Sequence, residues 1–425
     1  MCDQTHPHCL VYKYILCDEG GMDPGASRIR RFYLFRALTS FTLWMPFWIL
    51  WVDKNLESMF LITIVDSAFW TTMIFFQIPA GLLGDRYGRK TMLFLGEFLF
   101  AVGLLAFGLS TGFWEYFISN VIWALGVCFI VSGDTPFLYD TLQELGRAKD
   151  YTMVMGRANA IMALVNALAC IVGGVIVKST GHVEYTLIMA SLVAMLGTFT
   201  VLLLKEPNVV DRKRITSYRA HFKTGFRIVL SSKAILIIIL FQIVVEIGIY
   251  VMAVFRPVYL HTYLSLGFLE IGIFYASFLL VGAMATWNAG KIEATLKEKW
   301  SLAFMYATMF GSFLIVFLVQ SVAAISTQYM IYIVAGVQGP ILFGYINKRV
   351  DSAHRSTVIA IATFMFTFIL TAVEVSSGWV ATAWGLTESL LVLALGSAPI
   401  AVLLMVLWNR QVDAEGKAET VQTQD

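Results

Sequence analysis

The stretch Gly81-Leu82-Leu83-Gly84-Asp85-Arg86-Tyr87-Gly88-Arg89-Lys90-Thr91 is a charged turn, punctuated by glycines, between two long apolar runs. Before it, residues 59–83 hold one ionisable residue, Asp66, and after it, residues 92–113 hold only Glu97. A helix of about 20 apolar residues spans a bilayer. Both runs are therefore predicted to be neighbouring transmembrane helices, and the three cations of the turn predict that it faces the cytoplasm.

The composition supports an integral membrane protein. Of the 425 residues, 58% are hydrophobic and 14% are charged, compared with about 25% charged in ordinary soluble domains. This excludes a soluble enzyme. The sequence contains no nucleotide-binding P-loop, no zinc-ligand spacing and no Ser/His/Asp constellation in a soluble region. We therefore expect no enzymatic activity and no cofactor, and any transport must draw on an ion gradient. The net charge of +2 without a basic block gives no reason to expect a nucleic-acid partner.

Apolar runs follow one another from residue 32 to residue 408 and predict twelve membrane-spanning helices, the first at 32–52 and the last at 387–408. With the N-terminus inside, the predicted cytoplasmic segments hold 26 of the 30 Lys and Arg residues. The four exceptions are Arg36, Lys54, Lys178 and Arg256. This distribution predicts that both termini are cytoplasmic, in a multi-pass protein of the cell's inner (plasma) membrane.

The longest loop lies after six predicted helices and before six more. The predicted organisation is a cytoplasmic tail (1–31), a six-helix bundle (32–204), a cytoplasmic linker (205–232), a second six-helix bundle (233–408) and a cytoplasmic tail (409–425). Three landmarks suggest that the halves are parallel repeats: the pairs Pro46/Pro257, Pro136/Pro340 and Arg157/Arg355, at offsets of 211, 204 and 198. The N-terminal tail does not have the layout of a signal peptide. It also matches no zinc-binding spacing, although it contains several possible ligands: Cys2, His6, His8, Cys9 and Cys17.

The turn at residues 81–91 resembles the signature loop between helices 2 and 3 of the major facilitator superfamily, G-x-L-a-D-r-x-G-r-k. The matching positions are Gly81, Leu83, Asp85, Arg86, Gly88, Arg89 and Lys90. Gly88 suits a tight turn, because glycine takes positive φ without steric cost. The resemblance implies an all-α membrane fold of two pseudo-symmetric six-helix bundles around a central cavity built from helices 1, 2, 4, 5, 7, 8, 10 and 11.

The same resemblance implies a gating latch on the inner side. In the family, the acid of the motif, here Asp85, faces the N-terminus of helix 11, where the helix dipole favours a negative charge. The family arginine, here Arg89, pairs with an acid at the inner end of helix 4, for which Asp140 is available. The latch is expected to hold the inner side closed and to release as the halves rock.

Other segments resemble a prokaryotic branch that is similar to drug/proton antiporters. Gln77-Ile78-Pro79-Ala80-Gly81 resembles the E-x-P-T-G end of helix 2 in that branch, with Gln77 replacing the acid, and Leu138-Tyr139-Asp140 resembles the L-Y-D end of helix 4. Two positions depart from the antiporter pattern. Ile122 stands where an arginine is usual, and the proline of the helix-5 motif is absent beside Gly173-Gly174.

Charged side chains in the hydrocarbon are costly, and are usually paired, water-facing or functional. Depth along the predicted helices favours Asp134, Glu246 and Asp66 as buried carboxylates. Because desolvation disfavours the charged form, such a group can bind and release a proton as its access to water alternates. Asp134 and Glu246 are the first candidates in their respective halves. The alternative for Asp134 is a structural ion pair with Arg36 or Arg157.

Predicted helices 1 and 7 contribute three further candidate residues. Arg256 precedes Pro257 at the predicted outer end of helix 7, where it either extends to the interface as a snorkelling residue or contacts substrate. Trp44 and Trp48 lie four residues apart on one face of predicted helix 1. They are predicted to line the cavity, with packing or lipid contact as alternatives.

These observations predict a secondary active transporter that exports a small apolar or cationic compound, driven by a proton gradient, through rocking-bundle alternating access. Buried acids beside an aromatic path suit cations. One alternative is proton-coupled uptake of a small organic anion or metabolite, in which Arg36, Arg157 or Arg256 binds the anionic group. A second alternative is a transporter-like membrane sensor, against which the gating latch argues.

We expect such a transporter to work as a monomer in the lipid bilayer, with its substrate and protons as its only ligands.

Overall fold

The computed structural model describes residues 24–208, 218–351 and 354–422. The predicted tail cysteines and histidines, up to Cys17, lie outside the described residues. The helices are α2 Pro24–Thr39, α3 Trp48–Leu56, α4 Met59–Tyr87, α5 Arg89–Leu109, α6 Phe113–Glu144, α7 Tyr151–Thr180, α8 Glu184–Leu202, α9 Tyr218–Ser231, α10 Lys233–Val258, α11 Phe268–Trp287, α12 Ala289–Leu318, α13 Ile325–Arg349, α14 Arg355–Trp384 and α15 Leu386–Gln422, with short turns η1 Ala148–Asp150, η2 Tyr259–Tyr263 and η3 Val322–Ala324.

Among the described residues, eleven helices are long and apolar enough to cross a membrane. The first predicted crossing, at 32–52, is not among these eleven. It is divided between α2 and α3, so the prediction of one continuous helix there was wrong. Proline explains the break, because Pro46 lacks an N–H group and its ring excludes the helical carbonyl four residues before it. The broken segment packs tightly, since a Cβ on Gly173 of α7 would lie 2.9 Å from the Phe47 ring.

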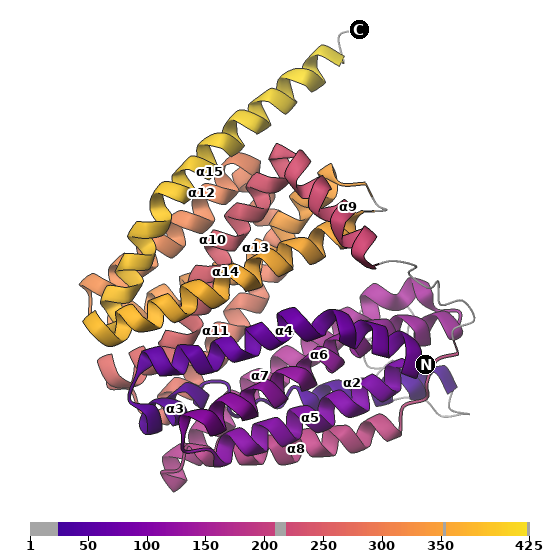
Figure 1. Cartoon of the computed structure of the whole chain (residues 1–425), viewed down its shortest axis with the longest axis vertical. Coiled ribbons are helices and arrows are strands. Elements are labelled where there is room, and N and C mark those ends of the chain that lie inside the picture. Colours follow the sequence, from indigo (N-terminus) through magenta and orange to yellow (C-terminus); the bar gives the residue numbers. More distant parts are fainter. Residues whose placement is uncertain (1–23, 209–217, 352–353, 423–425) are drawn as a thin grey trace, which may run out of the picture.

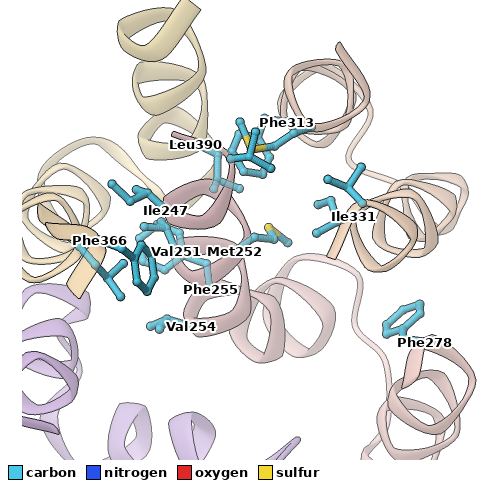
Figure 2. Close-up of a cluster of buried hydrophobic side chains, with 14 of the residues drawn as sticks. Ile247, Val251, Met252, Val254, Phe255, Phe278, Phe313, Ile331, Phe366 and Leu390 are labelled. Atoms are coloured by element: carbon cyan, nitrogen blue, oxygen red, sulfur yellow. The ribbon is translucent and has the colours of Figure 1, made fainter. Parts of the chain in front are cut away.

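The helices form two groups, α2–α8 and α9–α15, which Figure 1 shows as the violet and the red-to-yellow parts of the chain. Helix α10 lies at the centre of the second group. Figure 2 shows its side chains Val251 and Phe255 surrounded by Phe313 of α12, Ile331 of α13 and Phe366 of α14. The helix is apolar on most of its circumference, as expected of a buried helix, and Gln242, Glu246 and Arg256 are its polar exceptions.

Two predicted loops and one predicted tail contain helices. The segment 205–232 contains α9, whose Gly225 packs against Ile361 of α14. The predicted tail 409–425 continues α15 as far as Gln422. The loop before predicted helix 9 is helical from Ala289 and is interrupted at Lys297, where φ is 59° and ψ is 171°.

The two groups meet at one end of the molecule. We call the end that carries the Gly81–Lys90 turn the motif end and the opposite end, where α4 begins, the far end. At the far end the Phe60 amide of α4 donates to Thr382 Oγ1 of α14 at 2.8 Å. Between α7 and α11, a Cβ on Gly174 would lie 2.8 Å from the carbonyl oxygen of Phe268. Small residues thus allow a close approach of the two groups.

At the motif end the groups diverge. Figure 1 shows them approaching each other near α3 and separating toward α9. Residues 75–79 of α4 are all exposed within the molecule. Five consecutive helical residues cover more than one full turn, so side chains on every side of this turn of α4 reach the surface. The structure is therefore closed at the far end and open at the motif end.

Candidate functional site

In the first group, Arg36 of α2 reaches across to Asp134 of α6. The Arg36 guanidinium donates to Asp134 Oδ2 and also contacts Met162 Sδ. The other Asp134 oxygen has no hydrogen-bond partner among the described residues. Glu97 of α5 is buried, and the charges of Asp134 and Arg36 act on it. Two acids and one arginine are thus gathered within the first group. The sequence predicted Asp134 and Arg36 as site residues but not Glu97.

In the second group, the described side chains that donate to Glu246 of α10 are two amides. Gln242 Nε2 donates to Glu246 Oε1 at 3.1 Å from one turn earlier on α10. Gln338 Nε2 of α13 approaches the same oxygen at 3.4 Å. Neither partner carries a charge, in contrast to the arginine that faces Asp134. A carboxyl group in such surroundings depends on a proton, or on a bound cation, to compensate its charge.

A third pair of acids lies where the groups meet. Asp66 of α4 accepts a hydrogen bond from Trp70 Nε1 at 3.2 Å, and its carboxyl group interacts with that of Glu374 on α14. The Trp70 ring makes edge-to-face contact with Tyr250 of α10 at 5.1 Å, and Tyr250 in turn contacts Phe366 at 5.3 Å. These three rings form an aromatic cluster contributed by both groups.

The spacing of acids and aromatic residues in the sequence could have predicted part of this cluster. Asp66 and Trp70 lie four residues apart, as do Glu246 and Tyr250, and residues at that spacing share one helix face. Glu374 lay in a predicted helix as an isolated acid. Only the packing of α4 against α14 and α10 brings Asp66 and Trp70 close to Tyr250 and Glu374.

Arg256 does not extend to an interface, so the snorkelling alternative was wrong, and substrate contact stays a prediction. The side chain is 3% exposed. Its Nε donates to Gln328 Oε1 at 2.8 Å, and its guanidinium lies 4.7 Å from the centre of the Tyr332 ring and 5.8 Å from that of Tyr275. Aromatic faces and an amide oxygen compensate the charge, so the helix can keep Arg256 inside the bundle.

Trp44 and Trp48 are not on one helical face, because Trp44 lies in the break before α3. The Trp44 ring packs edge-to-face on Trp123 of α6, with centroids 4.5 Å apart. The Trp48 ring contacts Phe107 of α5 at 5.9 Å. Both rings therefore pack within the first group, and the prediction of a shared helical face was wrong, whereas their place along a cavity stays a prediction.

The loop motif forms an ion-pair cluster at the motif end. Arg89 donates to Asp85 Oδ1 at 2.7 Å, and its Nε lies 4.0 Å from Asp140 Oδ2. Gly88 has φ +98°, as a tight turn requires. Gly81 is partly buried, and Arg86 is exposed with its guanidinium 5.3 Å from the Tyr87 ring.

Glu206 of the linker completes this turn and was missed from the sequence. Its two carboxylate oxygens accept from the backbone amides of Arg89 at 2.8 Å and Lys90 at 2.6 Å. A negative charge there satisfies unpaired amides and the dipole at the start of α5. A Cβ on Gly88 would lie 2.9 Å from Glu206 Oε1, so the glycine also leaves room for the cap. Lys90 Nζ donates to the Leu202 carbonyl at 2.9 Å.

The second group repeats the ion pair of Arg89 with Asp140 with its two charges reversed. Lys297, Glu298 and Arg349 lie 209 positions after Gly88, Arg89 and Asp140, respectively. Lys297 has positive φ, as Gly88 has, and Arg349 Nη2 pairs with Glu298 at 2.8 Å. Glu415, 209 positions after Glu206, also binds Arg349, at 2.6 Å. The loop has lost the sequence pattern but has kept the turn and an ion pair, which supports a duplication.

A cavity of about 520 Å³ lies within the second group, between α10, α12, α14 and α15. Its walls are mostly aliphatic, with Ser376, Ser377 and Ser389 among the polar residues. None of the predicted site residues lines it. Asp66, Glu374 and the aromatic cluster lie instead where α4 of the first group meets α10 and α14 of the second.

Solved structures of other transporters share this fold. The nucleoside transporter NupG is 14% identical, covers 89% of this chain and 98% of its own, and superposes with a TM-score of 0.76. A bacterial homologue of the human lysosomal transporter Spinster, in an inward-facing and unoccupied conformation, covers 92% of this chain and 98% of its own with a TM-score of 0.74. At this identity the likeness concerns the fold alone.

Sequence relatives point to the same family. Multidrug resistance protein 2 of Bacillus subtilis (strain 168) is 28% identical over 36% of this chain and 37% of its own length. The inner membrane transport protein YajR of Escherichia coli (strain K12) is 30% identical over 28% of this chain and 25% of its own. The chain thus spans well under half the length of these relatives. The family model described as Major Facilitator Superfamily matches residues 32–373, and the chain belongs to this superfamily of multi-pass membrane transporters, not to the enzymes.

Proposed function

We propose that the chain is a proton-driven exporter of a small cationic or largely apolar compound. As a major facilitator transporter it moves a small molecule across the membrane by secondary transport. The observation that carries the finer proposal is Glu246, a carboxyl group within a membrane-spanning helix whose described partners are the neutral amides of Gln242 and Gln338. Such a group binds a proton or a cation in exchange.

The aromatic cluster supports a cationic or apolar substrate. Trp70, which donates to Asp66, contacts Tyr250, which follows Glu246 by one helical turn, and aromatic faces attract cations while accepting apolar surface. The names of the Bacillus relative and of the Escherichia coli relative MdtM, both multidrug resistance proteins, support the same substrate class. Asp134, which faces Arg36, is proposed as a second coupling acid. A proton and the Arg36 guanidinium would compete for its carboxylate.

The proposed orientation places the motif end in the cytoplasm. The cations concentrated at that end, together with both termini, fit the positive-inside rule. The halves 32–204 and 233–408 are proposed to rock as units, so that the far end opens as the motif end closes, with the chain acting as a monomer in an inner membrane. The ion pair of Arg89 with Asp85 and Asp140 is proposed to rearrange when the motif end closes.

The test uses purified protein in liposomes that contain a pH-sensitive dye. A pH gradient is imposed and lipophilic cations, neutral drugs and small organic anions are added in turn. Proton movement opposite to the flux of a cation supports the proposal. Glu246→Gln and Asp134→Asn are expected to abolish it, whereas Glu270→Gln, at an exposed position of α11, is expected to retain it.

Proton movement in the same direction as an anion would refute export and favour uptake. Full proton-driven flux in both Glu246→Gln and Asp134→Asn would refute the assignment of the coupling acids. Correct folding of each variant is checked by its elution as a single species and by its melting temperature.

A further inference from the structure

The packing of α4 against α14 places two acids opposite each other. The helices run antiparallel, and their contacts follow one register: Phe60 meets Thr382, and Trp70 meets Phe366, whose ring centroid is 6.4 Å away. Asp66 lies between Phe60 and Trp70 on α4. Glu374 lies between Thr382 and Phe366 on α14. The register therefore brings the two carboxyl groups face to face across the contact between the groups.

Thr63 and Gly378 fix this register one turn closer to the far end. A Cβ on Gly378 would lie 2.8 Å from the carbonyl oxygen of Met59 and would also overlap the Thr63 side chain. The backbones of α4 and α14 are therefore close at this point. The two acids can move apart only if the helices separate, which is the motion that opens the far end.

Neither acid has a cationic partner among the described residues. Glu374 is 1% exposed, and neither of its oxygens accepts a hydrogen bond from an N–H or O–H group there. Asp66 accepts only from Trp70. From α10, Tyr250 faces Asp66, and Glu246 lies one turn away. No charged group described on α3, α5, α6, α9, α13 or α15 acts on either carboxyl group.

Two carboxylates in contact repel each other, and apolar surroundings strengthen the repulsion. A shared proton removes it, because a protonated carboxyl group donates a hydrogen bond to a carboxylate. We propose that Asp66 and Glu374 form a proton-binding site that holds the far end closed when protonated and opens it when the last proton leaves. Asp66 is the partly exposed member, so it exchanges the proton with water.

The inference rests on the proposed function only for the direction of proton movement. With the motif end in the cytoplasm, a proton that binds from outside closes the far end, and its release inside allows the far end to reopen. Export of substrate on the reopening stroke then follows. The pair would thus act beside Glu246, which sits within one half and makes no contact that the far end must break.

The experiment measures the far-end distance as a function of pH. Spin labels are attached at Thr180→Cys on α7 and Trp384→Cys on α14, both exposed at the far end, in a chain whose native cysteines are replaced. Distance distributions are recorded by pulsed electron resonance in lipid nanodiscs without substrate or gradient. In the otherwise unmodified protein, the open population should rise by up to about tenfold per pH unit for each proton released.

The variant Asp66→Asn with Glu374→Gln keeps hydrogen-bonding groups but cannot ionise. It is expected to stay closed at every pH, and Glu374→Gln alone is expected to reduce the pH response. Glu270→Gln, an exposed acid at the same end, should titrate like the parent protein. The proposal would be overturned if the parent protein showed no pH response. It would also be overturned if the double variant and Glu374→Gln alone both responded to pH as strongly as the parent.

The distance measurement separates this proposal from the proposed function. It requires no substrate, so a far end that titrates in the parent and stays closed in the double variant supports the acid pair even if the liposome assay refutes export. Conversely, proton-driven export with a far end that does not respond to pH overturns the acid pair alone. Should the double variant not fold, Asp66→Asn and Glu374→Gln are measured separately with the same criteria.

Discussion

Gly174→Ala is expected to shift the transporter toward the far-end-open state. A Cβ at Gly174 would lie 2.8 Å from the Phe268 carbonyl oxygen, which is 0.6 Å short of the 3.4 Å at which ordinary contacts begin, and 3.0 Å from Leu269 Cα. Both atoms belong to the backbone of α11, so the helices themselves must separate. Overpacking of this kind costs about 1–3 kcal/mol. Because the cost falls on the closed far end, it corresponds to a shift of about 5–150-fold in the equilibrium.

The same pair of labels, on α7 and α14, reads this shift. Gly272→Ala should act alike, since its Cβ would overlap the Cys170 carbonyl from the other side of the contact. Gly311→Ala on α12 is the matched control, because a Cβ there meets nothing within 4 Å. Distance distributions for Gly174→Ala that match those of the parent and of Gly311→Ala would refute the view that this contact limits far-end opening.

Three further predictions concern the motif end. Glu206→Ala should lower the free energy of unfolding by about 0.5–2 kcal/mol, since the first amides of α5 lose their cap; an unchanged melting temperature would contradict this. Lys297→Gly should raise that temperature, because glycine relieves about 1 kcal/mol or more of backbone strain at positive φ, and a lower value would argue against strain. Arg349→Ala should speed proteolysis of the chain after residue 408, since Glu298 and Glu415 lose their shared partner; unchanged cleavage would show that the end of α15 is held otherwise.

Much of the architecture could be predicted because each crossing is specified locally. A membrane-spanning helix satisfies its own backbone hydrogen bonds, so an apolar run of sufficient length specifies one without reference to its neighbours. The turn around Gly88 was equally local, and its motif identified the superfamily that the family model then matched. The exceptions are also local in origin. Pro46 breaks the first crossing, and the predicted loop before helix 9 is reduced to an interruption at Lys297 within α12.

The site was predicted less well, because partners of charged groups come from distant segments. Asp134 and Glu246 were found from their depth, but the difference between them, an arginine facing one and amides facing the other, depends on α2 and α13. Arg256 was misjudged because its position in the chain suggested an exposed helix end, whereas Tyr275 and Tyr332 enclose it.

The sequence by itself determined eleven of the twelve predicted crossings, the family and the turn at the motif end, since hydrophobic length and glycine geometry act over a few residues. Tertiary structure alone decided which acids meet. Asp66 and Glu374 are 308 positions apart, and nothing in either helix favours the other until α4 and α14 pack in register. The physical reason is that desolvation and repulsion between charges depend on distance in space, which the close contact at Gly378 sets.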